Sequence, residues 1–184
     1  MSLSTSDILQ LYHQQGQRLY SGEAVSQLEH ALQCASLAEA AGHSSAMIVA
    51  CLLHDIGHFY PVDPVTADDI SAEDRHAERA SILLQGRLNA AVTEPIRLHV
   101  AAKRYLCAVE PGYWQKMSVA SQQSLEQQGG IFSTEAAQAF IAQPYAAEAV
   151  QLRRWDDCAK VIGLPTPDLS HFAPMLTACA LGAN

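Results

Sequence analysis

The chain of 184 residues carries a formal net charge of −8, and hydrophobic residues make up 49% of it. This length and composition favour one domain, residues 1–184, with a substantial core and no disordered segment. Net acidity without a Lys/Arg-rich run argues against a nucleic-acid-binding surface. No apolar run reaches the roughly 18 residues of a membrane helix, and no basic and apolar leader opens the chain, so a soluble cytoplasmic protein is expected.

Apolar residues recur at helical spacing along most of the chain, and no segment alternates like a strand. The sequence therefore predicts an all-α fold, with a loop at 59–72. Ser44 or Ser45, and Ser133 or Thr134, can begin helices as N-caps, and Pro95 suits a first turn. The cysteines form no CxxC pair, and Cys34, Cys51 and Cys107 are expected to be buried free thiols. The predicted helices span residues 4–18, 24–41, 45–57, 72–86, 94–110, 118–130, 133–143, 146–163 and 167–181.

Three polar residues interrupt the apolar segment CLLHDIGHFY at 51–60. A single buried histidine is usually a hydrogen-bonded core residue. However, His54 and His58 are four residues apart and share a face if the helix continues that far. Asp55 lies between them, and a buried carboxylate is costly unless it is paired or bound to a metal. The three together indicate a functional site.

Other predicted helices supply possible partners for His54 and Asp55. Each of them could be structural alone, but together they form a set of imidazoles and carboxylates without thiolates. Such a set suits iron, manganese or another first-row ion, and Asp55 could bridge two ions. The sequence therefore predicts a dinuclear metal site, with Asp157 as a rival to Asp156. The candidate ligands are His30, His54, Asp55, His76, His99 and Asp156.

The order of these ligands resembles the HD-domain superfamily, specifically its dinuclear members. The resemblance covers nearly the whole chain and implies an all-α bundle whose core helices carry the metal ligands. HD proteins are mostly metal-dependent phosphohydrolases, and a smaller branch consists of mixed-valent di-iron oxygenases. The ligands alone do not separate the two branches, because dinuclear phosphodiesterases use a similar set.

The segment YSGEAVSQLEHALQCA at 20–35 resembles the phosphonate-cleaving PhnZ type of di-iron oxygenase. In that type a Tyr-x-x-Glu pair precedes the first histidine ligand by the same spacing, and here the pair is Tyr20 and Glu23. The resemblance implies that Tyr20 occupies a metal position until substrate displaces it, and that Glu23 contacts the substrate's amino group. The alternative is that Tyr20 packs on the bundle while Glu23 is an acidic residue in a first helical turn.

A second group of residues is similar to the phosphonate-binding positions of the PhnZ type. Cations and hydroxyls at helical spacing from the metal ligands could bind a doubly charged phosphonate. Ser124 departs mildly, because the family can carry threonine there. The alternative for the group is a solvated polar helix face. Its members are His58, Lys103, Ser121, Ser124 and Arg153.

The resemblance implies a specific reaction and cofactor. One iron of an Fe(II)/Fe(III) pair would take His30, His54, Asp55 and Asp156, and the other would take Asp55, His76, His99 and the removable Tyr20. The enzyme would use O2 to convert (R)-2-amino-1-hydroxyethylphosphonate to glycine and phosphate in phosphonate catabolism, with Tyr20, Glu23 and His58 as the residues closest to catalysis. N-methylated and short hydroxyalkyl phosphonates stay open as substrates, as does the oligomeric state. The alternatives are a dinuclear phosphohydrolase, which leaves Tyr20 and Glu23 unexplained, and a regulatory HD module, which the intact ligand set argues against.

Overall fold

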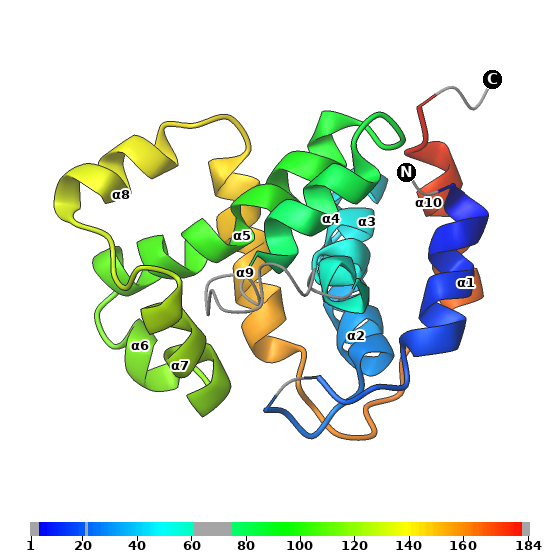
Figure 1. Ribbon diagram of the computed structural model, residues 1–184, viewed down its shortest axis with the longest axis horizontal. Helices are drawn as coiled ribbons and strands as arrows, with labels where there is room; N and C mark the ends of the chain where they lie inside the picture. The colour runs from blue at the N-terminus through cyan, green and yellow to red at the C-terminus, as the bar shows by residue number, and fades with distance from the viewer. Residues whose placement is uncertain (1–3, 21, 61–74, 182–184) are drawn as a thin grey trace, which may run out of the picture.

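The computed structural model describes residues 4–20, 22–60 and 75–181, and the helices in these ranges form a bundle without a β-strand (Figure 1). The expected all-α fold is confirmed, while most of the predicted loop at 59–72 lies outside the described residues. In chain order, the elements are α1 (Thr5–Gln15), α2 (Gln27–Ala40), α3 (Ser45–Leu53), the 3₁₀ helix η1 (Ile56–Phe59), α4 (His76–Leu84), α5 (Ala90–Val109), α6 (Tyr113–Lys116), α7 (Val119–Gln127), α8 (Thr134–Ile141), α9 (Ala146–Cys158) and α10 (Leu169–Ala178).

Serine caps define where several helices begin. Helix α2 begins at Gln27 rather than at residue 24, because Ser26 and Glu29 form a capping box in which each side chain accepts from the other's backbone N–H. The predicted caps Ser44 and Ser133 are confirmed for α3 and α8. These caps satisfy N–H groups that have no partner inside the helix.

The prediction of one helix over 45–57 is wrong. Helix α3 ends at Leu53, and η1 begins at Ile56 after Asp55 has left helical geometry with φ −103° and ψ 8°. His54 and His58 therefore do not share one continuous helical face. The break is accompanied by a very close approach between η1 and α4, in which a β-carbon added to Gly57 would lie 2.0 Å from the carbonyl oxygen of His76.

Boundaries of α5 and α9 also differ from the prediction. Helix α5 begins at Ala90, so Pro95 lies inside the helix rather than in its first turn. Proline there lacks the N–H of a helical hydrogen bond, and the buried Val92 and Ile96 on either side hold this part of the helix through packing. Helix α9 ends at Cys158, five residues before the predicted end at residue 163.

Helices α5 and α9 cross at the middle of the molecule and pack on each other (Figure 1). The 20-residue helix α5 is about 30 Å long. It packs against α3 and α4 on one side and α8 on the other, while α1 and α10 cover the far side of α3. Helices α2, α3, α5 and α9 therefore meet around one central region.

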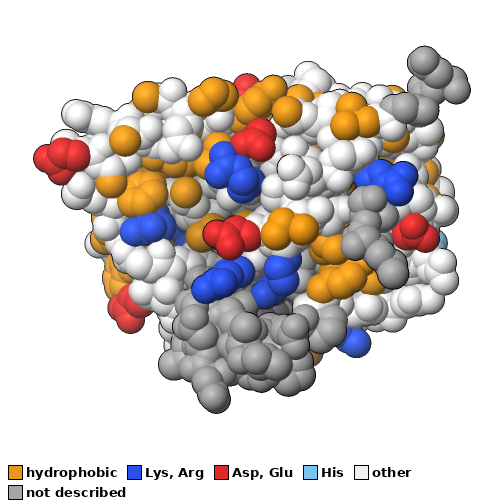
Figure 2. Space-filling view, turned by 45° about the horizontal axis from the view of Figure 1, so that its top comes forward, with side chains coloured by type: hydrophobic (Ala, Val, Ile, Leu, Met, Phe, Trp, Pro, Cys, Tyr) orange, Lys and Arg blue, Asp and Glu red, His pale blue; other side chains and the backbone are white. Residues whose placement is uncertain are grey.

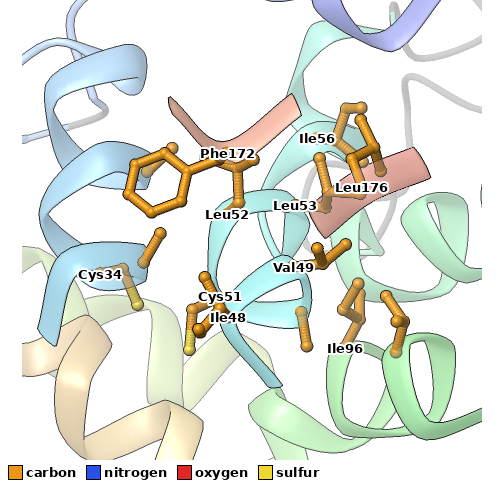
Figure 3. Packing of buried hydrophobic residues seen from close by; sticks show 14 of the residues in the cluster. Cys34, Ile48, Val49, Cys51, Leu52, Leu53, Ile56, Ile96, Phe172 and Leu176 are labelled. Atoms are coloured by element: carbon orange, nitrogen blue, oxygen red, sulfur yellow. The ribbon is translucent and has the colours of Figure 1, made fainter. Parts of the chain in front are cut away.

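The main hydrophobic core surrounds α3, whose Met47–Leu53 segment is buried throughout. Figure 3 shows Phe172 and Leu176 of α10 beside Leu52 and Leu53 of α3, with Ile96 of α5 at the opposite side. Smaller apolar clusters pack α5 against α8, α9 and α7. Because the core closes around α3, the polar residues at its C-terminal end are buried with it.

Figure 2 shows a face of the molecule on which Lys and Arg side chains are interspersed with Asp and Glu. Among the described residues, no helix combines the length and the hydrophobicity that crossing a membrane requires. Cys34 and Cys51 are buried free thiols as predicted, whereas Cys107 is only partly buried.

Candidate metal centre and adjoining cavity

Two groups of potential metal ligands share one carboxylate in the centre of the bundle. The first is His30, His54 and Asp55, the second is Asp55, His76 and His99, and in each group one atom per residue lies within 4.8 Å of the others. All five side chains are buried. They come from α2, the end of α3, the start of α4 and the middle of α5, which the helix packing brings together.

The two oxygens of Asp55 face different histidine pairs. Oδ2 lies 3.3 Å from Nε2 of His54 and 3.7 Å from Nε2 of His30. Oδ1 lies 3.3 Å from Nε2 of His76 and 3.7 Å from Nε2 of His99. Such an arrangement would allow the carboxylate to bridge two ions.

Backbone carbonyls fix the orientation of three of these imidazoles. Nδ1 of His30 donates to the carbonyl of Ala159 over 2.8 Å, and Nδ1 of His54 donates to Cys51 over 2.8 Å. Nδ1 of His99 donates to Ile96 over 2.7 Å. A proton on Nδ1 leaves a lone pair on Nε2, so these rings present metal-binding atoms to the centre of the cluster.

The inner atoms of the cluster fit a bound cation. Nε2 atoms lie 3.2 Å apart between His30 and His54, and 3.0 Å apart between His76 and His99. Ligand atoms about 2.1 Å from one ion and at right angles to each other are separated by about 3 Å. Asp55 Oδ2 and Asp156 Oδ1 are buried without a hydrogen-bond partner in the described part of the chain. Facing lone pairs and unpaired carboxylate oxygens are costly unless positive charge lies between them.

The electrostatics of the cluster agree with this geometry. Burial opposes a charge on His54, but the Asp55 carboxylate outweighs burial and raises the pKa of His54 to about 10. Burial and the charge of His54 lower the pKa of His99 to about 4. Burial and the neighbouring imidazoles, His58 first, also hold the pKa of His76 well below its usual range. The first group thus attracts positive charge, here as a proton on His54 that a bound cation would replace, while the second group keeps its imidazoles in the neutral form that binds metal.

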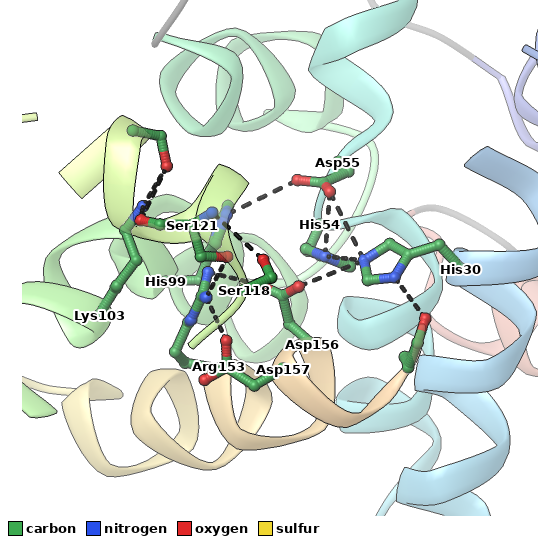
Figure 4. Close-up of polar contacts among 12 residues, drawn as sticks. His30, His54, Asp55, His99, Lys103, Ser118, Ser121, Arg153, Asp156 and Asp157 are labelled. Atoms are coloured by element: carbon green, nitrogen blue, oxygen red, sulfur yellow. Dashed lines mark hydrogen bonds and ion pairs between the residues drawn. The ribbon is translucent and has the colours of Figure 1, made fainter. Parts of the chain in front are cut away.

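The two neighbouring aspartates on α9 point to different places. Asp156 is buried, and its Oδ1 lies 3.3 Å from Nε2 of His30 at the first group. Asp157 instead accepts from Arg153 and from the hydroxyl of Tyr113. In Figure 4, Asp156 faces His30 while Asp157 lies beside Arg153. This geometry favours Asp156 over Asp157 as the ligand.

A cavity of about 270 Å³ adjoins the second group. His76, His99 and Asp156 form part of its wall. This size suits a small ligand, since typical drug-sized pockets begin at about 300 Å³. The predicted substrate-contacting residues all line the cavity: Tyr20, Glu23, His58, Lys103, Ser121, Ser124 and Arg153.

Two cations of this cavity are buried rather than solvated. Lys103 is 2% exposed and donates to Ser124 Oγ over 2.6 Å and to the Ser121 carbonyl over 3.4 Å. Arg153 is 4% exposed and donates to Ser121 Oγ over 3.1 Å and to Asp156 Oδ2 over 2.7 Å. Figure 4 shows both side chains turned toward Ser121. The alternative of a solvated helix face is therefore wrong for both cations.

Tyr20 and His58 lie at the edge of the two ligand groups. Tyr20 stacks on His30 of the first group with ring centroids 4.2 Å apart, and its hydroxyl interacts with Asp55, which both groups share. Burial and the charges of Asp156 and Asp55 raise the pKa of Tyr20 well above its usual value. His58 stacks on His76 at 4.2 Å, and its Nε2 lies 3.9 Å from Asp55 Oδ1.

Sequence reasoning missed Lys160, which lines the cavity, and Ser118, which contacts Lys160. Lys160 Nζ lies 2.9 Å from Glu23 Oε1 and 3.2 Å from Ser118 Oγ. No local signal marked Lys160, because it lies two residues beyond the end of α9 and shares no helical face with Asp156. Tyr113, which also contacts Arg153, had no signal because it lies on α6, a helix that was not predicted.

Comparisons with known proteins agree with this site. Residues 28–127 match the HD domain family. The chain is 43% identical to hydroxymethylphosphonate dioxygenase of Gimesia maris, over 95% of this chain and 87% of the relative. It is 38% identical to (1-hydroxy-2-(trimethylamino)ethyl)phosphonate dioxygenase (glycine-betaine-forming) of Leisingera caerulea, over 90% of this chain and 85% of the relative. The chain therefore belongs to the HD-domain family, in its branch of PhnZ-type phosphonate dioxygenases.

Proposed function

We propose that this chain is a di-iron oxygenase that cleaves the carbon–phosphorus bond of a 1-hydroxyphosphonate. (R)-2-amino-1-hydroxyethylphosphonate is the specific substrate proposed. With one O2 it yields glycine and phosphate, and the atoms of substrate and O2 balance those of the products. The observation that carries the proposal is Asp55, whose two oxygens face separate histidine pairs beside a cavity that contains Lys103 and Arg153.

Each of the two ligand groups would hold one iron ion. His30, His54, Asp55 and Asp156 would hold one iron, and Asp55, His76 and His99 would hold the other, with Tyr20 as a removable ligand. Bound iron would supply O2 activation and a Lewis-acid contact for the substrate's oxygens. The imidazole and carboxylate ligands, without thiolates, support a first-row metal such as iron.

The cavity residues would bind and orient the phosphonate. Lys103 and Arg153 supply positive charge, and Ser121, Ser124 and His58 supply hydrogen bonds to its oxygens. Ala120 and Ser121 of the first turn of α7 line the cavity, so the positive end of that helix dipole would also favour an anion there. Fixing the phosphonate would hold the C1–H bond toward the metal centre, which is the positioning that the reaction needs.

Glu23 would bind the amino group at the other end of the substrate. Its carboxylate lines the same cavity as Lys103 and Arg153, so one small molecule could contact the carboxylate and the cations together. The names of the two relatives indicate that the branch acts on hydroxyphosphonates with and without a nitrogen-bearing group. These names support the substrate class, and Glu23 supports the amino compound within it.

Release of phosphate tests the proposal directly. We expect protein reconstituted with Fe(II) and ascorbate to release phosphate and glycine from racemic 2-amino-1-hydroxyethylphosphonate only when O2 is present. Phosphate and glycine would be quantified against matched anaerobic samples and against protein treated with a chelator. Oxygen-independent cleavage of a phosphate ester with Mn(II), without any release from the phosphonate, would instead assign the chain to the hydrolases.

Replacing Glu23 by alanine tests the assigned amino-group contact. We expect Glu23→Ala to lower kcat/KM for the amino substrate by about tenfold, the effect of losing one charged hydrogen bond. Iron content should not change, because Glu23 belongs to neither ligand group. Hydroxymethylphosphonate, which has no amino group, serves as the control substrate and should lose less. Equal losses for both substrates would contradict the role of Glu23.

A further inference from the structure

Lys160 occupies the position beside Glu23 from which a substrate ammonium would be bound. It lies two residues beyond the end of α9 and lines the cavity with Glu23 and Ser121. Its Nζ is 2.9 Å from Glu23 Oε1 and 3.2 Å from each of the hydroxyls of Ser118 and Ser121. The Lys160 and Glu23 side chains are only 12% and 13% exposed, so this ion pair is largely removed from water.

The charge of Glu23 is therefore already compensated before any ligand arrives. Burial alone would raise the pKa of Glu23, but hydrogen bonds from Ser118 and Lys160 and the charge of Lys160 lower it. Glu23 is thus an ionised carboxylate with a cation and a hydroxyl beside it. The Lys160 ammonium also lies 5.6 Å from the centroid of the Tyr20 ring, within reach of a cation–π contact.

The same ammonium belongs to the anion-binding side of the cavity. Ser121 Oγ lies 3.1 Å from Nη2 of Arg153 and 3.2 Å from Nζ of Lys160, so this hydroxyl joins the two cations. A phosphonate at Ser121 would gain from Lys160, whereas an ammonium at Glu23 would be repelled by it. Lys160 thus attracts the phosphonate end of an aminophosphonate and repels its ammonium end.

We propose that Lys160 sets specificity among hydroxyphosphonates by competing with a substrate ammonium for Glu23. The inference rests on the proposed function and refines its substrate class. With Lys160 in place, an ammonium-bearing substrate must share or displace this cation, while a substrate without an ammonium leaves the ion pair undisturbed. Lys160 is a positioning residue in this scheme because it acts on the ammonium through Glu23.

Equilibrium binding tests the inference. We would measure Kd by calorimetry for iron-loaded protein without O2, using 2-amino-1-hydroxyethylphosphonate and hydroxymethylphosphonate as ligands. The readout is the ratio of the Kd of hydroxymethylphosphonate to that of the amino compound. Lys160→Met should raise this ratio about tenfold, since one competing ionic contact is removed. Any loss of phosphonate affinity affects both ligands and cancels in the ratio.

Three variants separate specificity from a structural effect. Lys160→Arg keeps the positive charge and should keep the wild-type ratio. Lys116→Met removes a lysine whose side chain is 71% exposed and paired with Glu110, and should also leave the ratio unchanged. In a Glu23→Gln background, Lys160→Met should no longer change the ratio, because the carboxylate for which the two cations compete is absent.

The outcomes distinguish this inference from the proposed function. If both ligands bind and Lys160→Met leaves the ratio unchanged, competition for Glu23 is overturned and the proposed function stands. If the ratio changes equally in the Glu23→Gln background, Lys160 acts through another group and the inference is also overturned. If the wild-type protein binds neither phosphonate, the proposed function fails and this inference fails with it.

Discussion

Replacement of Asp55 by alanine is expected to remove both metal ions from the protein. Asp55 is the residue shared by the two ligand groups, and it supplies Oδ2 to one histidine pair and Oδ1 to the other. Without it, the second group consists of imidazoles alone, and the first group keeps Asp156 as its one carboxylate but loses the shared ligand. We expect the wild-type chain to bind two irons and the Asp55→Ala variant to bind less than about a tenth of that amount. Metal analysis after gel filtration measures the difference.

Thermal unfolding provides a second readout that does not depend on activity. A ligand at 100 times its Kd stabilises a protein by about 2.7 kcal/mol, which corresponds to a rise in Tm of roughly 5 to 10 °C for a chain of this size. Fe(II) added without O2 should raise the Tm of the wild-type protein by this amount and leave that of Asp55→Ala unchanged. Retention of two irons by the variant would contradict the bridging role of Asp55.

The adjacent aspartates on α9 offer a matched comparison. Asp156→Ala should lose iron from the first group, because Asp156 Oδ1 lies 3.3 Å from His30. Asp157→Ala should keep its iron, since Asp157 contacts Arg153 and Tyr113 instead. The reverse result, with Asp157→Ala depleted and Asp156→Ala loaded, would show that the ligand has been assigned to the wrong residue.

Replacement of Gly57 by alanine is expected to destabilise the protein strongly and to disturb the metal centre. The added β-carbon would lie 2.0 Å from the carbonyl oxygen and 2.8 Å from the carbonyl carbon of His76, so η1 and α4 must move apart. We expect the free energy of unfolding to fall by about 3 kcal/mol, the upper range for overpacking in a core. Because Asp55 precedes η1 and His76 begins α4, the same movement should reduce iron binding.

Gly86 supplies the control for this variant. Its φ is 73°, and a β-carbon added there meets nothing within 4 Å. Gly86→Ala should therefore cost only about 1 kcal/mol, from the left-handed backbone alone, and should bind iron normally. Chemical denaturation of the two variants, with metal analysis of each, makes the comparison. Equal stabilities would mean that the contact between Gly57 and His76 relaxes without cost.

Local sequence signals predicted the fold class and the residues that gather at the centre. Helical periodicity and the caps Ser44 and Ser133 depend on interactions within a few residues, so these features could be read from the chain. His54 and Asp55 stood out because polar groups followed an apolar run that must be buried. The other ligand candidates lie on different helices. The HD-domain resemblance indicated that they belong to one site, which no rule about neighbouring residues could show.

Features that depend on tertiary contacts could not be predicted from the sequence. The end of α3 at Leu53 is linked to the approach of Gly57 to α4, a contact between segments far apart in the chain. Pro95 lies inside α5 because packing overrides the usual preference for a first turn. The early end of α9 at Cys158 frees Lys160 from helical geometry, so its pairing with Glu23 could not be predicted from helical spacing.

The hydrogen bonds from Nδ1 of His54 and His99 have a mechanical consequence. The acceptor in each case is the carbonyl three residues earlier, that of Cys51 or Ile96. Each imidazole is therefore held by the backbone of the preceding helical turn. Ring rotation would break these bonds, and the positions of the Nε2 atoms therefore follow the positions of α3 and α5 as rigid bodies. Val49 of α3 and Ile96 of α5 lie in one apolar cluster that sets how these helices sit together (Figure 3). A substitution that changes the volume of a side chain in this apolar cluster would shift α3 relative to α5. The distance between the Nε2 atoms of His54 and His99 would then change, although the substituted side chain does not contact them.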